Sequence, residues 1–277
     1  MTLTHEVAGE GPAVVLLHSS VCDRRMWDAQ FPALVEAGHR VVRCDFRGYG
    51  ETPVAEHPYT DAGDVLGLMD ALGIERAALV GSSFGGRTAL LAAAHSPQRV
   101  TALALLCAGL PGHTDESHEL AAFDHWENKL LEAGDLDGAA AWNVSTWLGP
   151  EAGQAAREAV HRMQLHAFEV QSAAEEAVEK EGAAYVLSGT PAAQPPDLSR
   201  IEVPVLAVSG AHDLPDFRRM AALMPTLMPS ARHIELPWAG HLPALERPSE
   251  ITALLTGFLD GGSAVPAPGR VTHDEGV

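Results

Sequence analysis

The chain has 277 residues, of which 46% are hydrophobic and 20% charged, and its formal net charge is −19. This length suits one large α/β domain or two small ones. The electrostatic field of such a negatively charged chain repels nucleic-acid phosphates and anionic lipid surfaces. Since no cluster of Lys and Arg offers a local exception, neither nucleic acid nor a membrane is expected as a partner.

The amino terminus lacks the basic-then-apolar pattern of a signal peptide, and no apolar run approaches the ~20 residues needed to cross a bilayer. The three cysteines, Cys22, Cys44 and Cys107, are an odd number, and two of them lie in apolar, strand-like runs. This cysteine usage argues against a disulfide framework. It predicts a reducing compartment and a cytoplasmic location.

Short apolar runs of strand length alternate with helical stretches along most of the chain. Several of the runs are apolar on both faces, as buried parallel strands are. The predicted strands are 13–17, 40–44, 77–80, 100–107, 205–209 and 233–236, and the predicted helices are 27–36, 61–72, 84–95, 216–224 and 249–259. This alternation predicts an α/β fold with a doubly wound, mostly parallel sheet.

The alternation stops in the middle of the chain, where an Ala- and Glu-rich stretch contains three tryptophans and no strand-like run. We therefore expect residues 1–110 and 198–260 to form the core and residues 111–197 a helical cap inserted into it. The Gly- and Pro-rich residues 261–277 show no periodicity, so they are predicted to be a flexible tail.

A G-x-S-x-G pattern, Gly81-Ser82-Ser83-Phe84-Gly85, lies between a predicted strand and a predicted helix. This context is that of a nucleophile elbow, a sharp turn that exposes the central serine at the carboxyl edge of a sheet. Glycines on both sides remove side chains that would collide with the turn. Ser83 is therefore the candidate nucleophile.

A serine hydroxyl needs a neighbouring base, and the base needs a carboxylate that orients it. Position selects His241 from the 14 histidines, because it lies between the last predicted strand and the last predicted helix. Asp213 follows the strand at 205–209, and Asp216 is its nearest rival. If the strands are parallel, all of these loops lie at the same edge of the sheet as Ser83.

The oxyanion of a tetrahedral intermediate needs hydrogen-bond donors. One candidate is the backbone amide of Phe84, at a helix amino terminus where the dipole favours negative charge. The other is in the loop after the first core strand, His18-Ser19-Ser20-Val21, where we expect Ser20 to provide the amide.

These residues together resemble the α/β-hydrolase superfamily, whose chain order is serine, acid, histidine. Leu16-Leu17-His18, Asp45-Phe46-Arg47-Gly48-Tyr49-Gly50 and Glu246-Arg247-Pro248 also resemble the family's pattern. The resemblance implies an eight-stranded type of sheet and makes the insertion the family's variable cap. His18-Ser19, where the family usually has His-Gly, and the stretch Asp23-Arg24-Arg25-Met26-Trp27-Asp28 are similar to 3-oxoadipate enol-lactonases.

The resemblance implies a serine hydrolase that cleaves a carboxylic ester or lactone of a small acyl substrate. Cleavage of a C–C bond, acyl transfer or perhydrolysis by the same residues, and ligand binding by an idle triad, remain alternatives. His18, Arg24, Trp126 and Trp147 are candidate substrate contacts. No cofactor is expected, and no metal, because Ala122 stands where a zincin motif beginning at His118 needs its second histidine. The sequence leaves homodimer formation open.

Overall fold

The computed structural model describes residues 2–113, 116–181, 189 and 195–261. The predicted tail, except Gly261, lies outside these described residues. Among the described residues, no helix is both long enough and apolar enough to cross a bilayer.

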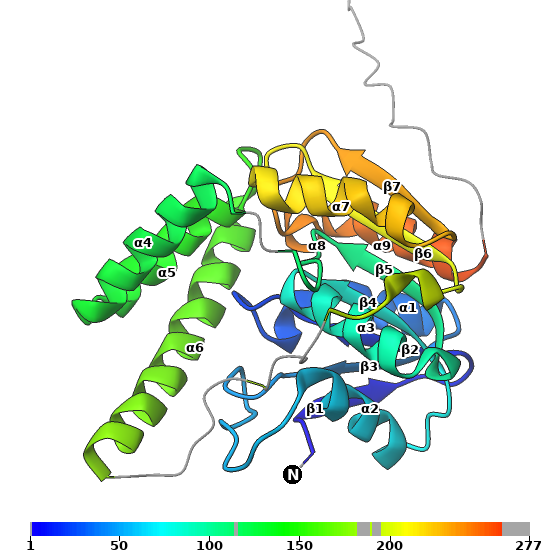
Figure 1. Cartoon of the computed structure of the whole chain (residues 1–277), viewed down its shortest axis with the longest axis horizontal. Coiled ribbons are helices and arrows are strands. Elements are labelled where there is room, and N and C mark those ends of the chain that lie inside the picture. The colour runs from blue at the N-terminus through cyan, green and yellow to red at the C-terminus, as the bar shows by residue number, and fades with distance from the viewer. Residues whose placement is uncertain (1, 114–115, 182–188, 190–194, 262–277) are drawn as a thin grey trace, which may run out of the picture.

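One sheet of seven strands organises the described part of the chain (Figure 1). The strands are β1 (His5–Ala8), β2 (Ala13–Leu17), β3 (Arg40–Cys44), β4 (Ala77–Ser82), β5 (Val100–Leu106), β6 (Val205–Gly210) and β7 (Ala231–Leu236). Their spatial order is β1-β3-β2-β4-β5-β6-β7, and only β1 is antiparallel to its neighbour. The predicted doubly wound, mostly parallel sheet is confirmed. β1 was not predicted, because its four residues include no apolar run.

Each central strand is buried on both faces because its successive side chains point to opposite sides of the sheet. In β2, Val15 and Leu17 belong to the hydrophobic core on one face, and Val14 and Leu16 to the core on the other. This is why the strand sequences are continuously apolar and do not alternate with polar residues.

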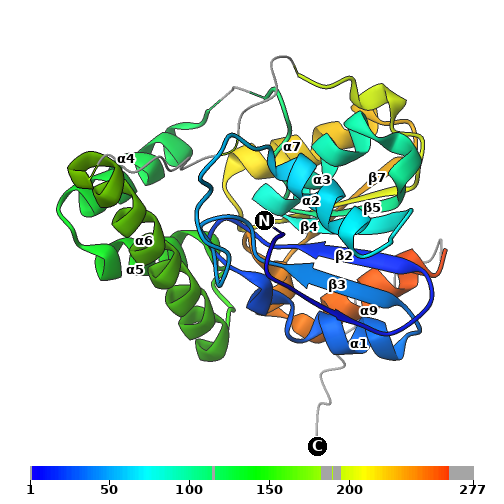
Figure 2. The same ribbon diagram turned by 90° about the horizontal axis from the view of Figure 1, so that it is seen from below.

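Helices cover both faces of the sheet (Figure 2). The core helices are α1 (Gln30–Glu36), α2 (Asp61–Ala71), α3 (Phe84–His95), α7 (Pro215–Leu227), α8 (Pro243–Glu246) and α9 (Pro248–Leu259). Apolar residues of α2, α3 and α7 share one core with the sheet, whereas those of α1 and α9 share the other. Short 3-10 helices at Arg24–Trp27, Pro97–Arg99 and Leu198–Arg200 complete the connections.

Among the described residues between β5 and β6, three α-helices lie together to one side of the sheet (Figure 1). These are α4 (His118–Glu132), α5 (Leu136–Trp147) and α6 (Gln154–Glu181), and we call them the cap helices. No strand occurs among the described residues of this stretch. The division into core and cap at residues 110/111 and 197/198 stays a prediction.

Candidate active site

Ser83 occupies the sharp turn between the central strand β4 and helix α3. Its φ of 51° lies in the left-handed region, which non-glycine residues rarely adopt. The flanking glycines make the turn feasible, since a Cβ at Gly81 would lie 2.5 Å from the backbone of Gly85, and one at Gly85 would lie 2.3 Å from the carbonyl oxygen of Leu17. The elbow expected from the sequence is therefore present, with its serine 6% exposed.

Asp213 and His241 form a buried hydrogen-bonded pair. His241 Nδ1 lies 2.8 Å from Asp213 Oδ2. Because a carboxylate only accepts, Nδ1 is the donor, and Nε2 of the neutral ring is left as an acceptor. The other carboxylate oxygen of Asp213 accepts from the amide of Leu214 at 2.7 Å. This geometry fixes both the tautomer and the orientation of the imidazole.

The loop that carries His241 packs directly on the carboxyl end of β6, which is where Asp213 follows. A Cβ at Gly210 would lie 2.0 Å from the carbonyl oxygen of Gly240, so only glycine permits this approach. The loop also contacts the end of α5, because the amide of His241 donates to the carbonyl oxygen of Trp147 at 2.7 Å. The cap helices therefore help to hold the histidine.

Two aromatic rings confine the imidazole of His241. The ring centroid of Phe217, on α7, is 4.2 Å away, and that of Trp147, on α5, is 4.6 Å away. Trp147 Nε1 donates to Asn143 Oδ1 at 2.9 Å, which fixes the indole. The sequence pointed to Trp147 but not to Phe217, because no local signal shows which face of α7 meets the histidine loop.

A pocket of about 400 Å³ opens over these residues, between the core and the cap helices. Ser83 and His241 both line it, together with Ser20 and its two neighbours. The amide of Ser19 donates to Met26 Sδ at 3.4 Å and is therefore engaged. The amide of Phe84 is the first of α3 and has no acceptor within the helix. Ser20 lines the pocket and Phe84 follows Ser83 directly, and their role as oxyanion donors stays a prediction.

Of the four predicted substrate contacts, only Trp147 lines this pocket. Arg24 is held by Glu6, Asp45 and Glu51, so its guanidinium fixes the loop after β2 and is not directed to a substrate. Trp126 is 48% exposed, because it lies on the outer face of α4 beside Lys129. The geometry of the pocket therefore gives no support to the predicted substrate contacts of these two residues.

His18 has a structural position beneath the site. Its Nε2 accepts from the amide of Phe46 at 2.9 Å, and its Nδ1 donates to the carbonyl oxygen of Ser19 at 2.8 Å. Burial lowers the pKa of His18, which keeps the ring neutral and suits this pair of bonds. With both nitrogens engaged, His18 supports the loop that carries Ser20, and the structure gives no support to its predicted contact with a substrate.

Asp216 has a buried carboxylate and Glu246 a half-buried one, and the sequence could not place either of them. Asp216, the rival of Asp213, accepts from the amide of Ser117 at 2.8 Å and so joins α7 to the start of α4. Glu246 accepts from the amide of Gly240 at 2.9 Å and from that of Leu242 at 3.3 Å, on both sides of His241. Asp216 therefore attaches the cap helices, and Glu246 shapes the histidine loop.

Cys107 lies beside the Asp213–His241 pair. The sulfur of Cys107, a carboxylate oxygen of Asp213 and a ring nitrogen of His241 lie within 4.8 Å of one another. Geometry alone would let such a set hold a metal ion. Burial, and then the nearby charge of Asp213, raises the pKa of the Cys107 thiol well above its ordinary value. Without a metal the thiol therefore stays protonated at neutral pH, and its Sγ donates to the carbonyl oxygen of Gly240 at 3.7 Å.

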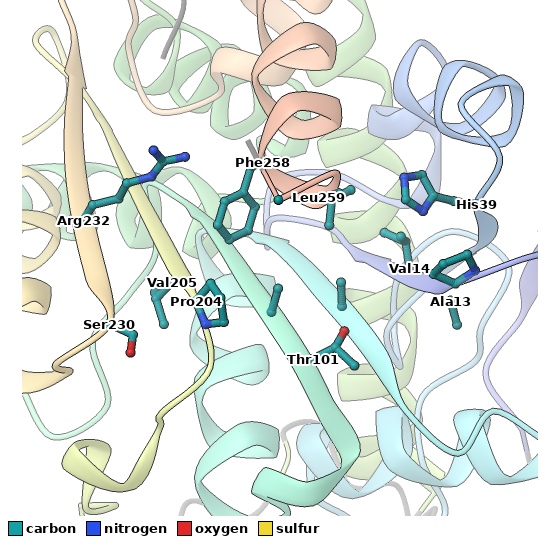
Figure 3. Close-up of a pocket in the computed structure, with 14 residues that line it drawn as sticks. Ala13, Val14, His39, Thr101, Pro204, Val205, Ser230, Arg232, Phe258 and Leu259 are labelled. Atoms are coloured by element: carbon teal, nitrogen blue, oxygen red, sulfur yellow. The ribbon is translucent and has the colours of Figure 1, made fainter. Parts of the chain in front are cut away.

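A second and larger cavity, of about 530 Å³, lies at the opposite ends of the strands (Figure 3). Its walls include the first residues of β2, β5 and β6 together with His39 and Phe258. It contains neither Ser83 nor the Asp213–His241 pair, so the smaller pocket is the candidate active site.

Comparison with known proteins agrees with this geometry. The model of a family described as alpha/beta hydrolase fold matches residues 12–248. The 2-hydroxy-6-oxo-6-phenylhexa-2,4-dienoate hydrolase of Comamonas testosteroni is 40% identical over 118 residues, and this match spans only 40% of this chain and 40% of that enzyme. A proposed carbamate hydrolase, RutD, of Klebsiella pneumoniae is 31% identical over 83% of this chain and 84% of its own.

A solved structure, that of the enol-lactonase from Burkholderia xenovorans LB400, superposes with a TM-score of 0.70 and 27% identity. It covers 93% of this chain and 96% of that one. The likeness to enol-lactonases noticed in the sequence thus extends over the whole fold.

Proposed function

Because the chain belongs to the enzyme family with the α/β hydrolase fold, we propose that it is a serine hydrolase acting on a carboxylic ester or lactone of a small molecule. The observation that carries the proposal is the buried His241–Asp213 hydrogen bond of 2.8 Å, whose histidine lines the same pocket as the elbow serine. These are the parts that acyl transfer by an activated serine requires.

In the proposed first half-reaction, Ser83 Oγ attacks the acyl carbon and His241 Nε2 takes the hydroxyl proton. Asp213 holds the ring and stabilises the imidazolium that forms. The amides of Phe84 and Ser20 bind the oxyanion, and losing one such donor typically costs about 3 kcal/mol of transition-state stabilisation. His241 then gives its proton to the leaving alcohol.

In the second half-reaction, His241 takes a proton from water, which attacks the acyl group on Ser83. The tetrahedral intermediate collapses, the carbonyl is restored and the acid is released as Ser83 regains its proton from His241. Phe217 and Trp147 keep the imidazole in one position through both steps, since their rings pack against it at 4.2 and 4.6 Å.

The test is covalent labelling with a fluorophosphonate probe. Wild-type protein is expected to be labelled, and Ser83→Ala is expected to remain unlabelled and to lose at least about 10⁴-fold in kcat on activated esters. Ser82→Ala is the matched control, because its buried hydroxyl has no hydrogen-bond partner among the described residues. Labelling that survives Ser83→Ala would refute the assignment.

C–C bond hydrolysis is the second candidate, and the partial match to the Comamonas dienoate hydrolase favours it. The same three residues would serve, with a carbanion as leaving group in place of an alcohol. Turnover of a vinylogous 1,3-diketone faster than that of any ester, judged by product analysis, would select this reaction. Tight ligand binding with turnover no faster than in Ser83→Ala would instead indicate an idle triad.

A further inference from the structure

The wall of the active-site pocket formed by the cap helices carries negative charge. Asp124 and Glu127, one turn apart on α4, both line the pocket. Among the described residues that line it, none is Lys or Arg. The arginines near the oxyanion loop do not compensate, since Arg24 is bound by three carboxylates and Arg25 by Asp23. A substrate with a carboxylate would therefore meet like charge in the pocket.

Within the part of the chain that the structure describes, neither of these two carboxylates has a cationic partner. Glu127 Oε1 accepts from Asn143 Nδ2 at 2.6 Å, which is a neutral partner. Burial raises the pKa of Glu127 and of Asp124, with the neighbouring Glu116 adding to the effect at Asp124. A cation placed between them would stabilise their charged forms and so bind favourably.

Gln164 on α6 supplies an independent sign of a polar ligand. It lines the same pocket and is 5% exposed, and its Oε1 is buried without a hydrogen-bond partner among the described residues. A buried amide group with an unmade hydrogen bond costs about 1–3 kcal/mol. A hydrogen-bond donor of a bound molecule would remove this cost.

Aromatic rings form much of the remaining wall. Phe123, Trp147, Phe168 and Phe217 all line the pocket. The faces of such rings attract alkylammonium groups, and cages of aromatic rings recognise quaternary ammonium ligands. The pocket thus combines, in about 400 Å³, two acidic groups, aromatic rings and a carboxamide oxygen that no described residue hydrogen-bonds.

We propose that the substrate is an ester or lactone that carries an alkylammonium group, bound by Asp124, Glu127 and the aromatic wall, and that substrates with a carboxylate are excluded. This inference rests on the proposed function for the reacting group but concerns the charge of the substrate. It separates this chain from hydrolases whose substrates are carboxylates.

Binding to Ser83→Ala tests the charge preference without turnover. The first series has three ligands. They are acetylcholine, the isosteric acetate with a tert-butyl group in place of the trimethylammonium group, and the acetate with a carboxylate in that place. A second series is methyl esters whose acyl chain ends in the same three groups, so that the charge lies on the other side of the carbonyl. Calorimetry is expected to give, in at least one series, about tenfold tighter binding for the cation than for the tert-butyl ligand, with the carboxylate weaker still.

Variants identify the groups responsible. Asp124→Asn with Glu127→Gln is expected to abolish the preference for the cation. Gln164→Met is expected to leave thermal stability equal or higher, because it removes a buried oxygen that has no hydrogen-bond partner among the described residues. Glu132→Gln is the matched control, because it removes one negative charge from α4 at an exposed position outside the pocket. The preference of this control for the cation should equal that of the Ser83→Ala protein without further substitution.

The outcomes separate the two proposals. Equal or tighter binding of the carboxylate in both series, no binding of either ammonium ligand, or a cation preference that survives the double variant would overturn the charge inference. Wild-type protein could hydrolyse the esters that carry a tert-butyl group through Ser83 and yet show no charge preference. In that case the hydrolase proposal stands and the charge inference falls. If cations bind selectively but no ester is turned over, the charge inference stands and the hydrolase proposal falls.

Discussion

Asp216 accepts a hydrogen bond of 2.8 Å from the amide of Ser117, a residue 99 positions earlier in the chain. The hydroxyl of Ser117 also donates to this carboxylate, while it accepts from the amide of Leu120 at 3.1 Å as the N-cap of α4. A single serine therefore begins the first cap helix and attaches it to α7 of the core.

Ser117→Ala should destabilise the protein by about 1–2 kcal/mol, because it removes the helix cap and one of the two bonds to Asp216. Urea unfolding measures the change. Ser145→Ala, at an exposed position on α5 where the hydroxyl contacts only its own helix, should stay within about 0.5 kcal/mol of wild type. Equal effects of the two substitutions would contradict the role given to Ser117.

Glu246→Ala should reduce kcat by about 10- to 100-fold with a small change in KM. The variant leaves the amides of Gly240 and Leu242 without their acceptor, so the loop that orients His241 against Asp213 loosens. Ester hydrolysis and urea unfolding should be measured together, with the exposed Glu36→Ala as control. Unchanged kcat in a destabilised Glu246→Ala protein would mean that this carboxylate supports the fold alone.

Two glycine substitutions should have opposite effects on stability. Gly85→Ala places a methyl group 2.3 Å from the carbonyl oxygen of Leu17, and we expect a loss of about 3 kcal/mol or more, with little soluble protein. Gly67→Ala, in the interior of α2 with no atom within 4 Å of the new methyl group, should gain about 0.5–1 kcal/mol. Thermal unfolding and soluble yield check both, and a well-folded Gly85→Ala protein would disprove the close packing at the elbow.

Asp61→Asn should stabilise the protein at pH 8 and not at pH 3.5. Burial raises the pKa of Asp61 to about 6, so above that pH the native state carries a carboxylate that is costlier than in the unfolded chain. As the pH falls below 6, the native group protonates first and the cost shrinks, and it is gone below the ordinary value of about 3.9. After a discount for partial exposure, we expect a gain of about 1 kcal/mol at pH 8.

Denaturation of wild type and Asp61→Asn across this pH range measures the difference, with the exposed Asp137→Asn for comparison. A gain of the same size at pH 8 and pH 3.5 would show that titration of Asp61 is not its cause.

The family order of serine, acid and histidine could be read from the sequence because each residue follows directly on a strand. In a parallel sheet, the carboxyl ends of strands meet at one edge, so placement along the chain implies placement in space. The geometry at that edge brings Asp213 and His241 to 2.8 Å and puts Ser83 and His241 in one pocket. Their catalytic roles remain a proposal.

Side chains that act across distant elements could not be predicted in this way. Arg24 and Trp126 had suitable chemistry close to the expected site, but their burial and partners depend on how separate segments pack. Phe217 gave no local signal, and Glu246, although part of a family-like segment, gave none for its role. The reason is that their neighbours in space are an aromatic ring from the cap and the histidine loop.

The strands β2 to β7, the elbow at Ser83 and the resemblance to the family could be read from the sequence alone, because apolar runs, the glycines at 81 and 85 and short motifs each extend over a few residues. Only the tertiary structure decided which face of each cap helix closes over the serine, and with it the acidic and aromatic wall of Asp124, Glu127 and Trp147. The physical reason is that a helix carries its amphipathic pattern in its own sequence, whereas the surface that its faces meet is set by contacts between segments far apart in the chain.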